Sequence, residues 1–596
     1  MHFIARLIVA VLLLHSIFFT MYWFNLSRTF RRDGLNYEQK RIQYAFMGIP
    51  IDEIGKQLDL WLDVDAKISL SPSILKNEFL HQRFTEGLYP RLMDRNAPYL
   101  LEISTAQSIA PKNAVELVKL RGSESVYLLS QAPPPWKITT RTPTVDTQNQ
   151  YRFSWIGFLL PILSILGYGG LFLWFIQRKS RNTEHYFTIA ISIILGALFI
   201  GLTASVMSWV QFQLPWHVLL YVGVATCVLL APFWKKTLSL QKMYYPQSEF
   251  VVFLVLLFFS FLKIMIFPIV LWDGRSVWLF NAKKIFFHGM LSKGDALNPE
   301  MLFSHPDYPL LFPAWLSHFS SFGGVYNEHM AALAIPILYG ASLGLVWFFS
   351  RKVLGRFCGS GLTLWLFFLT ENLTGGAYVD GFVLIFTWIA LLSYFVPSYR
   401  WVCTIALMVL SLLKVEGILI AGLMAIVLGL LCPVLEGRVF YRRFFLLLFL
   451  VPTLMHRLWL ILTQVQSSDP FVLDHLWQDF FPRLLDIFKG IPVMLSNPGY
   501  TGTRFGIWDG FFAILAFTVF AVWLKIRQRT FSWPAKACAW LSLCLVIISL
   551  IVLILLPHDT QWLVQVTLDR LLLVPSTLMV LGFILLLKQT DSAPLS

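Results

Sequence analysis

Charged residues are scarce in this 596-residue chain: Asp, Glu, Lys and Arg make up 13% of it, whereas 57% of its residues are hydrophobic. Soluble domains carry about 25% charged residues, so the composition excludes an ordinary soluble protein. Apolar runs of about 17–25 residues, the length needed to cross a bilayer, recur along the chain. Because these runs are continuous and do not alternate with polar residues, they predict transmembrane helices.

Cysteine is also rare, with 6 residues, and none of them falls in a predicted outer loop. A disulfide framework or a cysteine-based metal site is therefore not indicated. The spacing of His288, His318 and His329 suggests no metal site either. The first apolar segment, residues 4–24, lacks a small-residue cleavage site, which favours a retained anchor over a signal peptide.

The net charge of +14 raises the question of nucleic-acid binding, but its distribution indicates membrane topology instead. Lys and Arg gather in short loops between apolar runs, as is typical of loops on the cytoplasmic side. This places both chain ends in the cytoplasm and excludes nucleic acid as a partner. The clusters are Arg178/Lys179/Arg181, Lys235/Lys236/Lys242, Arg351/Lys352/Arg356, Arg438/Arg442/Arg443 and Lys525/Arg527/Arg529.

The predicted fold is an all-α polytopic membrane protein of about 14 transmembrane helices with one small extramembrane domain. An anchor at 1–24 precedes an α+β domain at 25–152, for which we expect a docking or structural role. Additional helices at 153–248 lead to a membrane core at 249–588 and a cytoplasmic tail at 589–596. Helical patterns at Tyr37–Phe46 and Ile51–Leu62, and strand patterns at Ile68–Leu70 and Val126–Leu129, support the α+β domain.

After the anchor, the remaining spans are predicted near 154–176, 186–209, 217–234, 249–271, 328–350, 358–374, 379–397, 400–416, 417–434, 444–463, 508–525, 536–556 and 571–587. One segment within the outer loop 272–327 has two interpretations. Pro309–Phe322 is apolar enough to be another span, but it is short and contains Pro313 and His318. If it crossed the membrane, Arg351 and its neighbours would lie outside, so an amphipathic helix on the outer surface fits better.

Ionisable side chains within or beside transmembrane helices are costly and by default mark function. In the predicted topology they gather toward the outer face. A carboxylate there could take a proton from an attacking hydroxyl, and cations at an apolar interface could hold a phosphate leaving group. The outer-face set is Asp273, Glu371, Asp380, Lys414, Glu416, His456, Arg457 and Arg570.

Structural roles stay open for the same residues. Asp273 could cap a helix or pair with Arg275, and Lys414 could form a structural pair with Glu416, since buried charges prefer partners. Arg457 and Arg570 could instead reach lipid headgroups with their long side chains.

Five segments together resemble the GT-C superfamily of membrane glycosyltransferases, which use polyprenyl-phosphate sugars. The chain looks closest to bacterial relatives of the protein O-mannosyltransferases and of the lipid A aminoarabinose transferase. The resemblance depends on the order of five elements and on their shared membrane side. They are Trp272-Asp273 after a span, the proline-bearing segment His305–Leu310, the basic turn Ser350–Phe357, the small-residue run Gly375–Gly381 and the Lys-x-Glu-Gly element Lys414–Gly417.

The resemblance covers residues 250–588 and implies inverting transfer of a sugar to a glycan, lipid or protein hydroxyl. It places the reaction at the outer face of a bacterial inner membrane, with membrane lipids around it. Asp273 would be the general base, and Lys414, Arg457 and Arg570 would hold the lipid phosphate. Gly274 stands where some members carry a second acid, so a divalent metal is left open as a cofactor. The substrate-binding candidates are Trp278, Lys283, His305, Asp307, Tyr308, Asp380 and Glu416.

Two rival functions come from other classes. A transporter or flippase of lipid-linked sugars would tend to carry repeated halves and broken helices at the membrane midplane. The chain has no clear internal repeat, and its ionisable groups lie toward one face. A non-catalytic scaffold that recruits partners through the 25–152 domain is the second rival.

Overall fold

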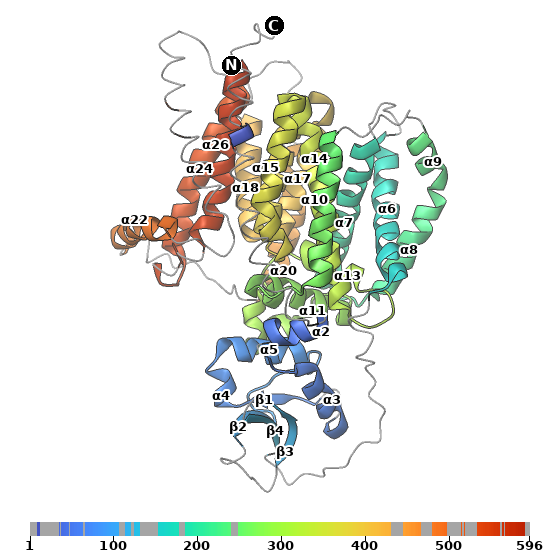
Figure 1. Cartoon of the computed structure of the whole chain (residues 1–596), viewed down its shortest axis with the longest axis vertical. Helices are drawn as coiled ribbons and strands as arrows, with labels where there is room; N and C mark the ends of the chain where they lie inside the picture. The colour runs from blue at the N-terminus through green and yellow to red at the C-terminus, as the bar shows by residue number, and fades with distance from the viewer. Residues whose placement is uncertain are drawn as a thin grey trace.

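The molecule consists of a helical body with a small mixed domain at one end (Figure 1). It is known from a computed structural model. In the part of the chain that the structure describes, six helices are long and apolar enough to cross a membrane, which agrees with the predicted class of helical membrane protein. The structure describes residues 9–11, 35, 37–46, 48–62, 66–105, 114–120, 124–130, 153–177, 185–239, 248–430, 445–465, 479–496, 514, 518, 533–560, 563–564 and 567–589.

The six long spans are accompanied by five shorter apolar helices of 10–17 residues in the described part of the chain. The number of about 14 spans therefore stays a prediction. Most residues of the predicted spans at 4–24 and 508–525, and all residues of three basic clusters (178–181, 438–443 and 525–529), lie outside the described residues. The six long spans are Trp155–Ile176, Phe187–Val210, Glu328–Leu354, Leu446–Thr463, Trp533–Leu555 and Arg570–Lys588.

In Figure 1 the helices form three groups side by side, with α14 to α18 in the middle. Within the groups α6 packs on α7 and α8, α14 on α15, α16 on α17, and α24 on α26. The helices of the body are α6 (Trp155–Gln177), α7 (His185–Val210), α8 (Trp216–Leu229), α9 (Ala231–Ser239), α10 (Ser248–Ile266), α14 (Glu328–Leu354), α15 (Arg356–Gly375), α16 (Asp380–Tyr394), α17 (Arg400–Leu413), α18 (Val415–Leu430), α20 (Leu450–Thr463) after the 3₁₀ turn η6 (Phe445–Phe449), α22 (Phe480–Ser496), α24 (Trp533–Leu555) and α26 (Leu568–Gln589).

Two predicted span boundaries are wrong in ways that matter. The segment 217–234 is divided between α8 and α9, which meet at Leu230. The predicted span 249–271 ends as helix α10 at Ile266, so Asp273 does not directly follow a span but opens a separate π-helical turn, η3 (Asp273–Leu279).

The small domain has a four-stranded sheet in the order β1-β2-β4-β3, in which β1 and β2 are parallel and the other pairs are antiparallel. The amphipathic helix α3 buries Ile51, Ile54 and Leu58 in the domain core. The predicted helical and strand patterns in this domain are confirmed. Its elements are α2 (Tyr37–Lys40), the π-helical turn η1 (Arg41–Ala45), α3 (Ile51–Trp61), β1 (Ile68–Leu70), α4 (Pro72–Leu75), α5 (Glu78–Leu88), β2 (Tyr99–Thr105), β3 (Ala114–Lys119) and β4 (Glu124–Ser130).

The segment between α10 and α14 forms a layer of short helices between the domain and the body (Figure 1). A helix was predicted at 309–322 on the outer surface, and its predicted exposure is wrong. The helix found there, α13, has nine residues, all of them buried, and packs among α7, α11 and α14. The layer consists of η3, α11 (Phe280–His288), α12 (Lys293–Leu297), the 3₁₀ turn η4 (Pro299–Ser304) and α13 (Leu311–Phe319).

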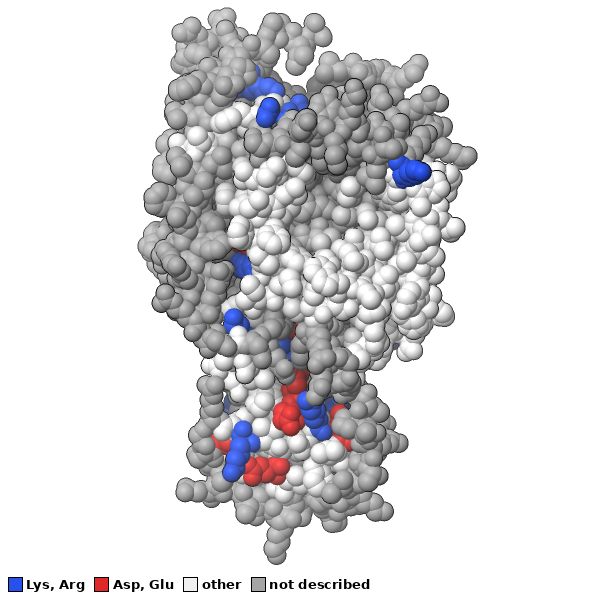
Figure 2. Space-filling view, turned by 45° about the vertical axis from the view of Figure 1, so that its right-hand side comes forward, with Lys and Arg blue, Asp and Glu red and all other residues white. Residues whose placement is uncertain are grey.

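Charged side chains occupy the two ends of the molecule. In Figure 2 Lys and Arg gather at the end of the body opposite the domain, acids and bases mix at the domain, and the described surface between them is almost free of charge. Arg351 and Lys352 lie at the end of α14 far from the domain, whereas Glu328 begins that helix beside the domain's Arg41. This arrangement is what loops on opposite sides of a membrane require.

Candidate functional site

A chain of ion pairs joins residues from four separate segments at the domain end of the body. The Arg570 guanidinium lies 2.6 Å from an Asp273 oxygen and 3.6 Å from an Asp380 oxygen. The Lys414 ammonium lies 3.2 Å from both Asp380 and Glu416. Five of the residues predicted from the sequence, including the candidate base, therefore form one connected group.

The local backbone explains how the two cations reach the acids. Lys414 has an extended backbone and lies between the end of α17 and the start of α18. Its side chain therefore projects from a break between two helices. The predicted span 400–416 is therefore interrupted at this residue. Arg570 lies near the start of α26, where its guanidinium also stands 5.2 Å from the centroid of the Tyr378 ring.

A close backbone approach brings η3 to the turn before α16. A Cβ atom at Gly274 would lie 2.1 Å from the carbonyl oxygen of Gly376. Asp273 and Asp380 can meet at one guanidinium because the residue between Asp273 and Arg275 has no side chain. The same approach leaves no room for a second acid at position 274.

Substituting Gly274→Ala should destabilise the protein by about 1–3 kcal/mol, the usual cost of inserting a methyl group into a filled site. The effect would be measured as a lower thermal unfolding temperature in detergent. Gly294→Ala is the matched control, because no atom lies within 4 Å of the added Cβ there. Equal stability of the two variants would contradict the close approach.

An apolar groove leads away from the charged group. Asp380, Lys414, Glu416 and Arg570 form its polar end. Its walls come from the facing sides of α16, α18, α24 and α26 and enclose about 40 Å³, so a long apolar chain would lie there only if these helices moved apart. The apolar lining residues are Val383, Leu419, Ile420, Leu545, Ile548, Val552, Leu571, Val574 and Pro575.

The predicted proline-bearing segment lies beside Lys414. The Tyr308 side chain is near enough to the Lys414 ammonium to interact with it electrostatically. The Tyr308 ring packs 4.6 Å from the His305 ring and 5.6 Å from the buried Trp278 ring. His305 has a left-handed backbone with φ of 50°, which closes the turn. Three of the predicted substrate-binding residues thus form an aromatic cluster next to the site.

The other candidates have different surroundings. Lys283 lines a separate cavity, where its ammonium donates to the carbonyl oxygens of Glu86 and Gly87. Asp307 is buried and its backbone carbonyl faces a His456 ring nitrogen at 2.9 Å. Arg457 is half-buried on α20, and no ion pair to the described part of the chain is found for it. Within the described residues, Lys283 and Arg457 therefore lie apart from the ion-paired group that contains Asp273.

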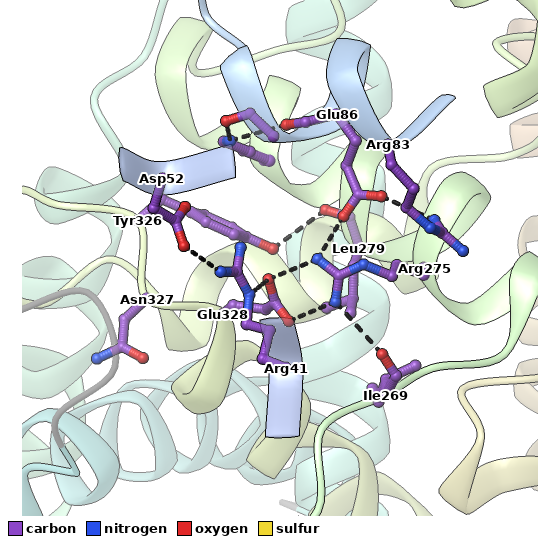
Figure 3. Close-up of polar contacts among 12 residues, drawn as sticks. Arg41, Asp52, Arg83, Glu86, Ile269, Arg275, Leu279, Tyr326, Asn327 and Glu328 are labelled. Atoms are coloured by element: carbon purple, nitrogen blue, oxygen red, sulfur yellow. Dashed lines mark hydrogen bonds and ion pairs between the residues drawn. The ribbon is translucent and has the colours of Figure 1, made fainter. Parts of the chain in front are cut away.

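A second charged group, which the sequence did not reveal, lies between the domain and the layer of short helices (Figure 3). The two terminal nitrogens of the fully buried Arg275 guanidinium donate to the Glu328 carboxylate, at 2.7 and 2.9 Å. Arg41 reaches the same carboxylate at 2.9 Å, and Glu86 reaches Arg275 at 2.6 Å. The predicted alternative of an Asp273–Arg275 pair is therefore wrong.

Two acids hold two arginines in this group against their mutual repulsion. Burial alone lowers the pKa of Arg275, but Glu328 and Glu86 more than offset that effect, so its pKa is raised. The guanidiniums of Arg275 and Arg41 each lie 4.4 Å from the centroid of the Phe46 ring. A cation over a ring face is further stabilised by the ring's negative face.

The same π-helical turn thus faces two ways. Asp273 at its start points to Arg570 in the body, and Arg275 two residues later is held by the domain and by α14. Further side-chain bonds tie the layer of short helices to the domain, so the domain fixes the turn that presents Asp273. They join Trp272 to Gln82 at 2.5 Å, Ser276 to Arg83 at 3.0 Å, Asp295 to Tyr89 at 2.8 Å and Glu300 to Arg95 at 2.5 Å.

The residues around Asp273 do not form an evident metal site. Within the described ranges, no three His, Cys, Asp or Glu side chains come together in a way that could hold an ion. The position between Asp273 and Asp380 is taken by a guanidinium. The donor set therefore does not fit the divalent metal that the sequence left open.

Comparison of the chain with protein-family models, with curated proteins and with solved structures found no match.

Proposed function

We propose that the protein is a glycosyltransferase of the GT-C type that moves a sugar from a polyprenyl-phosphate donor to an acceptor hydroxyl. The observation that carries this proposal is the apolar groove that ends on Lys414 and Arg570. Arg570 in turn forms an ion pair with Asp273. A lipid phosphate needs this combination of an apolar channel with cations at its end. A general base must then reach the acceptor hydroxyl on the side of the sugar opposite the phosphate, and Asp273 is the carboxylate proposed for this role.

In the proposed reaction the acceptor oxygen attacks the anomeric carbon of the sugar, and the bond from that carbon to the phosphate oxygen breaks. Asp273 accepts the acceptor's hydroxyl proton as the new bond forms. The bonding electrons leave with polyprenyl phosphate, whose added negative charge is stabilised by Lys414 and Arg570. Attack on the face opposite the phosphate inverts the anomeric configuration.

The remaining residues near the site have positioning roles in this proposal. Asp380 lies between the two cations, so it holds Lys414 and Arg570 at a fixed separation. Glu416 shares Lys414 and lines the groove, and the ring of Tyr308 with those of His305 and Trp278 offers an aromatic wall to the sugar.

The proposed location is the inner membrane of a bacterium, with both termini in the cytoplasm and the reaction at the outer face. The acceptor there would be a glycan, lipid or protein of the cell envelope. Supporting this orientation, Arg351 and Lys352 lie in the last turn of α14, whereas the first residue of that helix, Glu328, pairs with Arg41 of the small domain.

Reconstitution in proteoliposomes with radiolabelled polyprenyl-phosphate sugars and a cell-envelope extract tests the proposal. Transfer of label from the lipid to a new product supports it. Movement of labelled lipid between leaflets without a new product would indicate a flippase, and neither event would indicate a scaffold. Either of the last two results overturns the proposal.

Replacing Lys414→Gln should raise the KM for the lipid donor about 10- to 100-fold, because a hydrogen bond to a charged group contributes about 1.5–3 kcal/mol. Donor titrations in the reconstituted system measure this effect. Lys489→Gln is the matched control, because that lysine is 63% exposed on α22 and lies outside the groove. A KM for K414Q equal to that of the control would remove Lys414 from the phosphate site.

A further inference from the structure

A cleft of about 230 Å³ lies between the domain and the layer of short helices, apart from the groove at Asp273. One wall is formed by η1 and α3, a second by the end of α5 and the turn after it, and a third by α11. Glu328 at the start of α14 closes the bottom. Figure 3 shows the charged group that borders this cleft, and Asp52 and Tyr326 lie beside that group.

Among the charged residues that line the cleft, Lys283 is the one for which no ion pair is found in the described part of the chain. Four carboxylates line it, and each lies within 2.9 Å of an arginine. Four arginines take part in these pairs, so acids and arginines balance, and the two lysines of the lining remain. The carboxylates are Asp52, Asp59, Glu86 and Glu328, the arginines are Arg41, Arg83, Arg91 and Arg275, and the lysines are Lys56 and Lys283.

The two lysines are placed differently. Lys56 is 37% exposed at the rim and stands 4.0 Å from Glu53, a pair that water weakens. Lys283 reaches into the cleft from α11, where its ammonium donates to the backbone carbonyl oxygens of Glu86 at 2.9 Å and of Gly87 at 3.4 Å. Those contacts orient the ammonium but bring no countercharge within ion-pair distance.

Aromatic side chains form much of the remaining lining, and among them Phe287 is 44% exposed. The hydroxyls of Tyr89 and Tyr326 are already bonded to Asp295 and to the Leu279 carbonyl, so these residues offer ring surface and not hydrogen bonds. Aromatic rings next to fixed charges suit a ligand with apolar C–H faces and polar edges.

We propose that this cleft binds a saccharide group that carries a carboxylate or a phosphate, with Lys283 holding the anion. The volume suits one sugar-sized group, since a liquid water occupies about 30 Å³. Hydroxyls of the sugar would donate to Asp52 and Asp59, and its ring would pack on the aromatic lining. The proposal is independent of the glycosyl transfer at Asp273.

The charge of Lys283 gives this site a pH dependence. Desolvation lowers the pKa of Lys283 to about 8, while Glu86, Asp52 and Glu328 favour its charged form and Arg41 opposes it. The lysine is cationic below that pH and loses its charge as the pH rises through it. Affinity for an anionic sugar should therefore be highest below pH 8 and fall above it.

Titration calorimetry on the full-length protein in detergent tests the proposal with glucose 6-phosphate, glucuronate and neutral glucose as probes. We expect saturable binding of the two anions and at least tenfold weaker binding of glucose. Lys283→Gln should weaken anion binding about 10- to 100-fold, whereas Lys76→Gln, at an exposed residue directly after α4, should leave it unchanged.

Gly55→Phe provides a second variant that leaves the charges intact. A Cβ atom at Gly55 meets only the Leu88 side chain, at 3.7 Å, so the added ring enters the cleft and should abolish binding. Asp273→Asn should bind the anions normally. The proposal is overturned if neither anion binds saturably, if K283Q and G55F bind as well as the unsubstituted protein, or if D273N loses binding.

Discussion

Asp273→Asn should lower the rate of sugar transfer by about 10²–10⁴-fold, the range that a positioned general base contributes. Asparagine has nearly the same shape but cannot accept the acceptor's proton. Arg570 would keep Asp380 and the Tyr378 ring as neighbours, so the fold of the site should be preserved. Initial rates in the reconstituted system at saturating donor measure the effect.

Asp94→Asn is the control for this experiment. That carboxylate lies in the small domain, where it pairs at 3.0 Å with the exposed Lys67 and takes no part in the site. The control should transfer sugar at the normal rate. Transfer by D273N at more than half the normal rate, with the protein folded, would dismiss Asp273 as the base.

Glu328→Gln should destabilise the protein by about 3–5 kcal/mol, the cost of removing one partner from a buried ion pair. The glutamate is 8% exposed and is shared by Arg275 and Arg41. Its loss leaves these two guanidiniums with less negative charge between them. Because Arg275 belongs to the turn that begins with Asp273, transfer should fall as well.

Thermal unfolding and limited proteolysis measure this change, and proteolysis should detect release of the small domain before the body unfolds. Glu53→Gln is the control, because Glu53 is 49% exposed and its lysine partner is 4.0 Å away. Such exposed pairs contribute about 0–1 kcal/mol. If E328Q had the same thermal unfolding temperature as E53Q, the charged group would not be what holds the domain to the body.

Local sequence patterns predicted the parts of the fold in which neighbours along the chain decide the structure. The spacing of Ile51, Ile54 and Leu58 indicates one buried helical face, and α3 buries those residues. Asp380 and Lys414 stood out because charge inside an apolar run is costly. That cost is met by pairing them with each other, which the sequence alone did not specify.

Contacts between distant segments could not be read in the same way. Arg41 and Glu328 are 287 positions apart, and Glu328 at a helix start resembles any first-turn acid. Lys283 is close to Asp273 in sequence, but the helix that follows η3 directs it to α5. The α13 helix looked like a surface helix because nothing in its sequence shows that α7, α11 and α14 surround it.

Direct imaging of the donor lipid in the protein tests the central claim, that one site combines the base with a lipid-phosphate cradle. A cryo-electron microscopy map with polyprenyl phosphate added should place the phosphate within hydrogen-bond distance of Lys414 and Arg570. The tail should lie between α18, α24 and α26, and the space for the sugar should separate the phosphate from the Asp273 carboxylate. A phosphate bound at the opposite end of the body, or a tail outside this groove, would contradict the account.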